Sequence, residues 1–531
     1  MSTENKLNTR ASGVIALAVS FSRILGLVRE VAFNALLGTS SMGLFIVAFR
    51  VPNLLRDLFA EGALSTAFIT VFSQKIQKDG DNSAWELAAK MATLATVFMS
   101  VVTVLGVIFS DSLIGILAGG FAPENREMTI LLTRIMFPFI LLISLAALVM
   151  GMLNSRNVFG VPAMASSFFN IGSIVGGLLI GWKIDPEFGP QALIGLAIGT
   201  LIGGLLQLVI QLPSLRKVGF RFRPDFRWND PGIRRILILM VPSVIAASAV
   251  QINVMVNTGF ATHLGPEAVT WLNSAFRLMQ LPLGIFGVAV ATITLPVVSR
   301  IAAQTDKSQF GPTLGKALRL ALFLTLPSGV GLYFLANPII SLIYQRMAFT
   351  AADSLQTGLA LQFYAIGLVA YSWVKVLSPA FYAIDKKWTP MFVSFASIGL
   401  NFGLNYLFIF HFNFGHKGLA LSTSLAAGVN FFVLYLLMSR HVTTLETRRL
   451  LGTLARCLLS SAALGGICWL GLTYGDGWLN APHFWQKAGA LLLLIGGAAL
   501  VYIAACFVLR VEEIHEAARL VARKFSRRAG K

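Results

Sequence analysis

AFRVPNLLRDLFAEG, residues 48–62, is the stretch that decides how the rest of the chain is interpreted. It lies in an apolar run long enough to cross a membrane, yet it contains Arg50, Pro52, Arg56, Asp57 and Glu61. Charged side chains inside a membrane are costly, and they usually face a cavity or a partner. The stretch therefore indicates a membrane protein with a polar cavity.

The composition supports this setting. Hydrophobic residues make up 56% of the 531 residues, charged residues make up 12%, and the mean hydropathy is +0.75. Soluble domains carry about 25% charged residues, and only helices or closed barrels satisfy the backbone in lipid. We expect an all-α, polytopic integral membrane protein.

Fourteen apolar runs are long enough to cross a bilayer as helices. They cover residues 13–36, 43–72, 86–112, 128–153, 159–182, 190–213, 236–262, 268–299, 314–337, 356–383, 389–411, 417–439, 450–474 and 487–510. Arg23 interrupts the first run and no clear small-residue cleavage site follows it, so this run is predicted to be a retained helix.

Lysine and arginine gather in alternate connections, above all in 214–235 and in the tail 511–531. The intervening connections hold only Arg126, Lys183, Arg346, Lys417 and Lys487. This bias predicts that both termini face the cytoplasm. The net charge of +19 then reflects topology and attraction to anionic membrane lipids. Binding of nucleic acid by the basic tail is the less favoured alternative, and no nucleic-acid partner is predicted.

No pattern for catalysis is found. The three cysteines lie in apolar runs, the six histidines lie in loops, helix ends or the tail, and no phosphate-binding G-x-x-x-x-G-K-[ST] sequence occurs. We expect no enzyme activity, no metal site and no cofactor.

Positive charge dominates inside the predicted helices. The basic residues there are Arg23, Arg29, Arg50, Arg56, Arg134, Arg277 and Lys375, against the acids Glu30, Asp57 and Glu61. At 1.5 Å per residue, five of these arginines (Arg23, Arg29, Arg50, Arg56 and Arg277) fall between the midplane and the outer face. Planar guanidinium groups suit a diphosphate through paired hydrogen bonds. The alternative is that single arginines reach the outer headgroups, or that Arg56 pairs with Asp57 or Glu61. Arg134 and Lys375 can reach the headgroups or cap a helix.

A duplication supports the cavity. The triplet AFR occurs at 48–50 and 275–277, and the segments NVFGVP and DKKWTP end at Pro162 and Pro390 with nearly the same offset. We therefore expect two related six-helix units, followed by two further helices. The predicted regions are 1–213, a basic linker 214–235, 236–439, helices 450–510 and a basic tail 511–531. Gln251, Asn253 and Asn257 could line the cavity or join helices.

Four segments resemble the MurJ (MviN) family of bacterial lipid II flippases, within the multidrug/oligosaccharidyl-lipid/polysaccharide exporter superfamily. They are SRILGLVRE at 22–30, AFRVPNLLRDLFAEGALSTAF at 48–68, FPFILLISLAALVMGMLNSRNVFGVPA at 137–163 and FRLMQLPLGIFGVAVATITLPVVS at 276–299. The resemblance implies transport of an undecaprenyl-diphosphate-linked disaccharide-pentapeptide to the periplasmic leaflet of the inner membrane by alternating access, for peptidoglycan synthesis. It also implies a V-shaped pair of six-helix lobes and a groove for the lipid tail at residues 450–510. Other cell-wall synthesis proteins are candidate partners.

The resemblance also implies residue roles. The cavity arginines of the family match Arg23, Arg29, Arg56 and Arg277, with Ser22 and Thr270 beside them. Residues predicted to shape helices or gates are Pro52, Asn53, Asp57, Glu61, Pro162 and Pro282. Some relatives carry acids where this chain has Gly43, Phe276 and Gln280, so a mechanism that needs a carboxylate there is in question.

Three other functions stay open. Flipping of another polyprenyl-diphosphate oligosaccharide, of O-antigen or capsule type, would use the same arginines. A drug/cation antiporter would need a deep carboxylate, and the acids here are few and outnumbered. A scaffold without transport is disfavoured by the cost of five intramembrane arginines.

Overall fold

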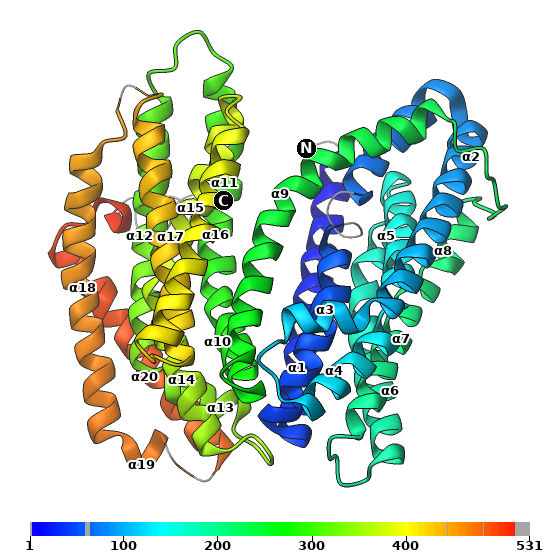
Figure 1. Cartoon of the computed structure of the whole chain (residues 1–531). Helices are drawn as coiled ribbons and strands as arrows, with labels where there is room; N and C mark the ends of the chain where they lie inside the picture. The colour runs from blue at the N-terminus through cyan, green and yellow to red at the C-terminus, as the bar shows by residue number, and fades with distance from the viewer. Residues whose placement is uncertain (1–2, 59–63, 443, 480, 482, 516–531) are drawn as a thin grey trace. The chain divides into compact units, whose positions relative to one another are not determined.

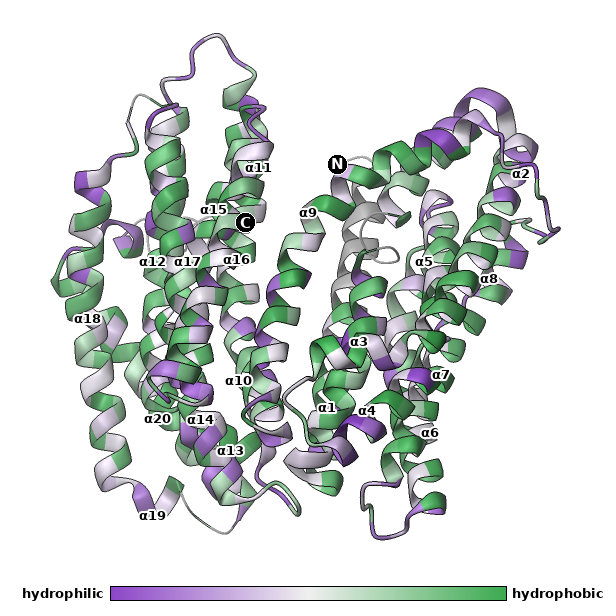
Figure 2. Ribbon diagram, viewed as in Figure 1, coloured by the Kyte–Doolittle hydropathy of each residue, from purple (hydrophilic) through white to green (hydrophobic). Residues whose placement is uncertain are grey.

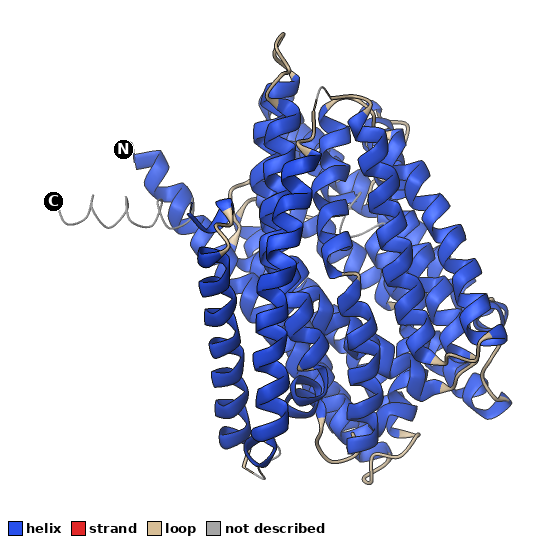
Figure 3. Cartoon of the chain, turned by 90° about the vertical axis from the view of Figure 1, so that its left-hand side faces the viewer, coloured by secondary structure: helices blue, strands red, loops and turns tan. Residues whose placement is uncertain are grey.

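The computed structural model describes residues 3–58, 64–442, 444–479, 481 and 483–515. Every regular element in that part of the chain is a helix, as Figure 3 shows, which confirms the all-α prediction. The chain divides into two compact units (Figure 1). Unit 1 comprises Met1–Thr270 and Arg346–Phe349, and unit 2 comprises Trp271–Gln345 and Thr350–Lys531.

Eleven of the described helices are long and apolar enough to cross a membrane, or up to 13 if two bent pairs are each counted as one span. Figure 2 shows apolar residues along the helices and hydrophilic residues at many of their connections. The count is lower than 14 because the two bent pairs are left out of the 11 and because helices that meet at a kink in α1 and in α2 are counted as one. In α1 (Thr3–Leu55) the helical dihedral angles break only at Gly38 (φ 73°), and in α2 (Ser65–Ile108) only at Gly80 (φ 80°). A glycine adopts positive φ without steric cost, so each helix turns sharply there.

In unit 1, α1 packs against α4 (Pro123–Met136) and α6 (Gly160–Ile184), and α6 packs along α7 (Ala192–Val209). Glycines let α6 and α7 approach closely. A Cβ at Gly195 would lie 2.2 Å from the Gly181 nitrogen, and one at Gly199 would lie 2.3 Å from the Gly177 nitrogen. Small residues serve this purpose in membranes, where helices associate through close packing because lipid tails are as apolar as leucine.

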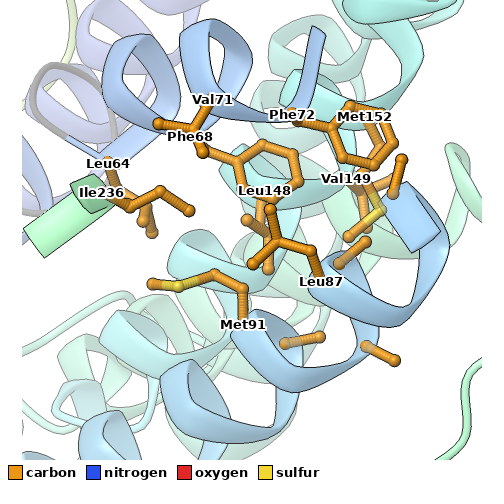
Figure 4. Packing of buried hydrophobic residues seen from close by; sticks show 14 of the residues in the cluster. Leu64, Phe68, Val71, Phe72, Leu87, Met91, Leu148, Val149, Met152 and Ile236 are labelled. Atoms are coloured by element: carbon orange, nitrogen blue, oxygen red, sulfur yellow. The ribbon is translucent and has the colours of Figure 1, made fainter. Parts of the chain in front are cut away.

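A second part of unit 1 is built from α2, α5 (Phe139–Ser155) and α9 (Pro231–Thr262), whose shared core is drawn in Figure 4. Phe68 and Phe72 are fully buried and their rings stack at 5.0 Å. The core begins at Leu64, so it holds the chain shortly after the charged stretch 48–62. The short helices α3 (Ser110–Leu117) and α8 (Leu212–Lys217) complete this unit.

In the described part of unit 2, α10, a π-helix and eight further helices precede the last three helices. They are α10 (Pro266–Pro282, whose first turn lies in unit 1), the π-helix η2 (Leu283–Val288), α11 (Ala289–Ala302), α12 (Phe310–Phe334), α13 (Ala336–Tyr344), α14 (Ala351–Ile366), α15 (Leu368–Ala383), α16 (Trp388–Tyr406), the π-helix η3 (Leu407–His411) and α17 (His416–Ser439). The central helix is α12, which packs against α11, α14 and α15.

The last helices α18 (Thr447–Tyr474), α19 (Asp476–Leu479) and α20 (Phe484–Val508) belong to unit 2 because α18 and α20 pack on each other and on α12. The buried guanidinium of Arg319 on α12 lies 2.7 Å from the Glu446 carboxylate before α18 and 3.0 Å from the Glu513 carboxylate after α20. Tyr502 Oη also donates to the Phe323 carbonyl at 2.8 Å. The predicted basic tail lies outside the described residues beyond residue 515.

The boundary between the compact units differs from the predicted repeat boundary. Lys90 Nζ on α2 donates to Asp230 Oδ2 at the start of α9 over 2.7 Å, and α9 packs on α2. These contacts draw α9, predicted as the first helix of the second repeat, into unit 1. The predicted regions were defined by a sequence repeat, whereas the compact units are defined by contacts between residues. The division into two six-helix repeats therefore stays a prediction.

Candidate functional site

The Asp57 carboxylate accepts hydrogen bonds from side chains at the end of α1 and on α9. Arg56 donates from Nε and Nη2 to Oδ1 at 3.1 and 2.8 Å, directly after α1 in a π-helical turn. Gln251 Nε2 of α9 donates to Oδ2 at 2.8 Å, and Asn53 Nδ2 donates to the same oxygen at 3.4 Å. A charge in a poorly hydrated setting is retained only when it is paired and hydrogen-bonded. Asp57 therefore fixes the orientation of Arg56, and its predicted part in a gate stays a prediction.

Pro52 lies inside α1 and has no N–H to give to the Ala48 carbonyl one turn earlier. Thr133 Oγ1 of α4 lies 3.3 Å from that oxygen, and it also lies 2.7 Å from the Thr129 carbonyl. A proline within a helix thus leaves an acceptor that a neighbouring helix partly satisfies. The π-helical turn at residues 56–58 follows four residues after the proline.

Arg29 lies on α1 with its guanidinium carbon 5.0 Å from the centre of the Phe169 ring on α6. Next to it, Asn170 Nδ2 donates to the Ser22 carbonyl at 3.1 Å, and a Cβ at Gly26 would lie 3.8 Å from the Asn170 amide. The ring face attracts the cation, and the asparagine joins the two helices. Ser22 therefore contributes its backbone carbonyl to helix packing, and its predicted contact with a substrate stays a prediction.

Thr270 is fully buried, and its Oγ1 donates to the Thr39 carbonyl at 2.7 Å. Thr39 follows the break at Gly38, where the Ala35 carbonyl accepts from the Ala348 backbone N–H at 2.8 Å. In this structure Thr270 supports the turn at Gly38, so its predicted contact with a substrate stays a prediction.

Gly43 has no room for a side chain. A Cβ there would lie 2.0 Å from the Pro266 carbonyl oxygen. The close approach explains why an acid does not fit at this position in this chain, although some relatives were expected to carry one.

Unit 2 contains the second AFR stretch of the predicted repeat. Arg277 is half-buried on α10, which ends at Pro282, and η2 follows directly. A Cβ at Gly287 of η2 would lie 2.9 Å from the Ser372 hydroxyl of α15. The sequence has no acid between Glu267 and Asp306, so η2 carries no residue equivalent to Asp57.

The other predicted residues have varied surroundings. Arg23 is exposed and Arg50 is half-buried, both on α1. Arg134 is exposed and donates from Nε to the Ser110 hydroxyl at 2.8 Å, and Lys375 is exposed on α15. Arg23, Arg29, Arg50 and Arg56 thus belong to unit 1, and Arg277 belongs to unit 2.

Two predicted helix-shaping residues need separate comment. Pro162 is the third residue of α6, where a missing N–H has no helical acceptor, so it starts the helix without kinking it. Glu61 lies outside the described residues.

Sequence reasoning missed the contacts of Thr133 and Asn170, because ordinary polar residues in apolar runs give no hint of their partners. Gln251 was left open between cavity lining and helix joining, and the structure has it bonded to Asp57. A pocket of about 270 Å³ lies among α5, α6 and α7 and is lined by Pro162 and Gln211, among others, and by none of the arginines. The described residues contain no group of three or more His, Cys, Asp or Glu that could hold a metal ion.

The helices form a fold found in solved membrane transporters. An inward-facing multidrug resistance MATE family transporter of the MOP superfamily matches with a TM-score of 0.66 at 17% identity, covering 79% of this chain and 95% of that one. At this identity the match concerns the fold alone. A solved structure titled lipid II flippase MurJ, inward closed conformation, matches with a TM-score of 0.76 at 28% identity, covering 93% of this chain and 98% of that one.

Sequence comparison gives the family. The family described as lipid II flippase MurJ matches residues 33–488. The probable lipid II flippase MurJ of Vibrio cholerae is 34% identical over 514 residues, covering 94% of this chain and 96% of that protein. The protein of the same description from Buchnera aphidicola subsp. Acyrthosiphon pisum is 37% identical over 423 residues, covering 79% and 81%. The chain belongs to the MurJ family.

Proposed function

We propose that this protein is a lipid II flippase of the bacterial inner membrane, which moves the undecaprenyl-diphosphate-linked glycopeptide from the cytoplasmic to the periplasmic leaflet for peptidoglycan synthesis. The observation that carries the proposal is membership of the MurJ family over most of the chain. The fold supports transport, and nothing in the sequence predicts catalysis.

The proposed ligands of the diphosphate are Arg23, Arg29, Arg50, Arg56 and Arg277. Guanidinium groups stay charged and bind phosphate oxygens through pairs of N–H groups. The contact between Arg56 and Asp57 supports this role, because the carboxylate accepts from Nε and Nη2 and fixes the plane of the guanidinium group.

Transport proceeds by alternating access in a chain that crosses the membrane 14 times, with both termini in the cytoplasm. The breaks at Gly38 and Gly80 support this count, because each divides a long helix near a predicted connection. Counting both bent pairs and three crossings within α1 and α2 gives 14. Two six-helix lobes forming a V, followed by two extra helices, are part of the same proposal.

The lipid tail lies along α18 and α20. Two adjacent glycines on α18 offer a matched test, because a Cβ at Gly465 would lie 2.9 Å from the Phe334 ring while one at Gly466 meets nothing within 4 Å. We expect Gly466→Leu to weaken binding of long-chain substrate more than of a short-chain analogue. Gly465→Leu should lower thermal stability through its clash with Phe334. Equal weakening for both chain lengths by Gly466→Leu would count against the groove.

The function is tested in a bacterium depleted of its own flippase. Expression of this chain should restore growth, and lipid II should become accessible to a membrane-impermeant probe at the outer surface. Rescue of O-antigen or capsule export without rescue of lipid II accessibility would replace lipid II with another polyprenyl-diphosphate glycan.

A further inference from the structure

The connection between α8 and α9, residues 218–230, exposes aromatic and basic side chains together. Phe222 and Phe226 are 54% and 66% exposed, and Arg221, Arg223 and Arg227 around them are exposed as well. In Figure 1 the connection runs beside α8 and α2, and Figure 2 shows many hydrophilic residues in it. Two large apolar rings that lie outside the core, within a basic segment, indicate a surface that contacts a membrane or another molecule.

The connection is held firmly at both ends, so the exposed rings are not a result of loose chain. Phe220 is buried with its ring 5.4 Å from the Trp85 ring, and Trp228 packs against the same core. Between them, the Asp225 backbone N–H donates to Thr93 Oγ1 at 3.1 Å. The two anchors leave only the middle of the segment facing outward.

Charge within the segment is permanently positive. Asp225 binds the Arg227 guanidinium at 2.6 Å, and this hydrogen bond lowers the pKa of the Asp225 carboxyl to about 2. Asp225 therefore stays ionised at physiological pH, and its negative charge balances the positive charge of Arg227. Arg221 and Arg223 keep their charge for an external partner.

The chain on either side sets the depth of this segment. Before it, α7 exposes Leu205 and Val209, and the exposed basic residues Arg216 and Lys217 follow. After it, α9 begins with the exposed pair Arg234 and Arg235, and the exposed apolar residues Leu237, Ile238 and Val241 come next. Each side therefore passes from lipid-facing apolar residues to basic residues. Such a change marks the headgroup level, where basic residues sit beside the acyl region.

We propose that residues 221–227 form a binding site for anionic phospholipid at the membrane surface, with Phe222 and Phe226 inserted beside the acyl chains and Arg221 and Arg223 bound to headgroup phosphates. Basic residues near an anionic leaflet are attracted to it electrostatically. Aromatic rings favour the interface between headgroups and acyl chains. The site holds the start of α9 at that interface, and it is independent of lipid II transport.

The depth of the segment is measured on the full-length protein in nanodiscs of phosphatidylglycerol and phosphatidylcholine. Spin labels are attached at Phe222→Cys and Phe226→Cys, and the three native cysteines are buried. The control label is Asn82→Cys, an exposed position in the turn after Gly80. We expect oxygen to reach the two phenylalanine positions and a water-soluble nickel complex to reach Asn82. The proposal would be overturned if the labels at 222 and 226 were as accessible to the nickel complex as the label at position 82.

The lipid preference is measured by retention of phosphatidylglycerol after delipidation, using native mass spectrometry. Arg221→Gln and Arg223→Gln should each lower its affinity about fivefold, corresponding to about 1 kcal/mol. Lys78→Gln, an exposed lysine in the turn at Gly80, serves as the matched control and should have a smaller effect. An equal loss of phosphatidylglycerol affinity in the control and in the two arginine variants would overturn the proposal. So would spin labels that become shielded from the nickel complex only when an acidic protein is added. Neither readout depends on flipping activity.

Discussion

Residues 48–58 of unit 1 and residues 275–288 of unit 2 share a sequence pattern and a backbone distortion. Each begins with AFR, continues to a proline and then enters a π-helical turn, at 56–58 in the first and 283–288 in the second. π-helical turns are rare and often accompany functional sites. The surroundings differ, because the first turn contains Asp57 with its three donor side chains, while the second has Ser372 of α15 close to Gly287 and no acid.

The difference teaches that a repeated pattern can keep its geometry and change its electrostatics. Arg56 forms an ion pair with the Asp57 carboxylate. The sequence from Arg277 to the end of η2 contains no acidic residue. The effect of replacing each arginine should therefore depend differently on its neighbouring residues. Four predictions address that difference, in order of decreasing effect.

Arg277→Ala should abolish flipping, by about 100-fold or more. A charged hydrogen bond contributes up to about 3 kcal/mol, and a flipped diphosphate would lose such a bond in this variant. Arg277→Lys should recover little, because it keeps the charge and loses the planar pair of donors. The measurement is lipid II accessibility in depleted cells, with membrane insertion checked by fractionation. Arg300→Ala, at an exposed arginine of α11, is the control. Full activity of Arg277→Ala would refute the arginine site. Alanine at Arg23, Arg29 or Arg56 should act in the same direction.

Asp57→Ala should lower stability by about 1–3 kcal/mol, because three half-buried donor side chains lose their acceptor. It should reduce flipping less than Arg277→Ala does, since Arg56 keeps its charge and loses only its fixed orientation. Thermal unfolding in nanodiscs and the accessibility assay give the two values, and the exposed Glu187→Ala is the control. If Asp57→Ala and Arg56→Ala acted additively in the double variant, the two side chains would not work as a pair.

Thr133→Val should cost about 1 kcal/mol of stability, because it removes the hydroxyl near the Ala48 carbonyl that Pro52 leaves without a helical donor. In a Pro52→Ala background the backbone N–H is restored, so the same substitution should cost clearly less. A double-mutant cycle on thermal unfolding measures the coupling. Identical costs in both backgrounds would show that the threonine serves only its own helix, through the Thr129 carbonyl.

Asn53→Ala should have the smallest effect, about 0.5 kcal/mol or less. Its amide lies 3.4 Å from Asp57 Oδ2, at the far limit of a hydrogen bond, whereas the Gln251 contact is 2.8 Å. Gln251→Leu should therefore destabilise more than Asn53→Ala in the same unfolding experiment. The reverse order would mean that the two donors have exchanged roles in the folded protein.

The sequence by itself determined the class of protein. Apolar runs fix membrane helices because the bilayer requires about 20 apolar residues for each crossing, and charges in those runs are conspicuous because they are costly. The excess of arginine, the AFR repeat and the resemblance to the MurJ family could all be read without coordinates. These features are local or compositional.

Tertiary structure alone decided which residues meet. Gln251 reaches Asp57 across 194 residues of sequence, Thr133 reaches Ala48, and Phe169 lies under Arg29. The kink at Gly38 of α1 was hidden too, because a single glycine can join two helices without the polar loop that sequence patterns detect. Hydropathy records the transfer of each residue into lipid, while hydrogen bonds between helices depend on register and close packing, which no single segment contains.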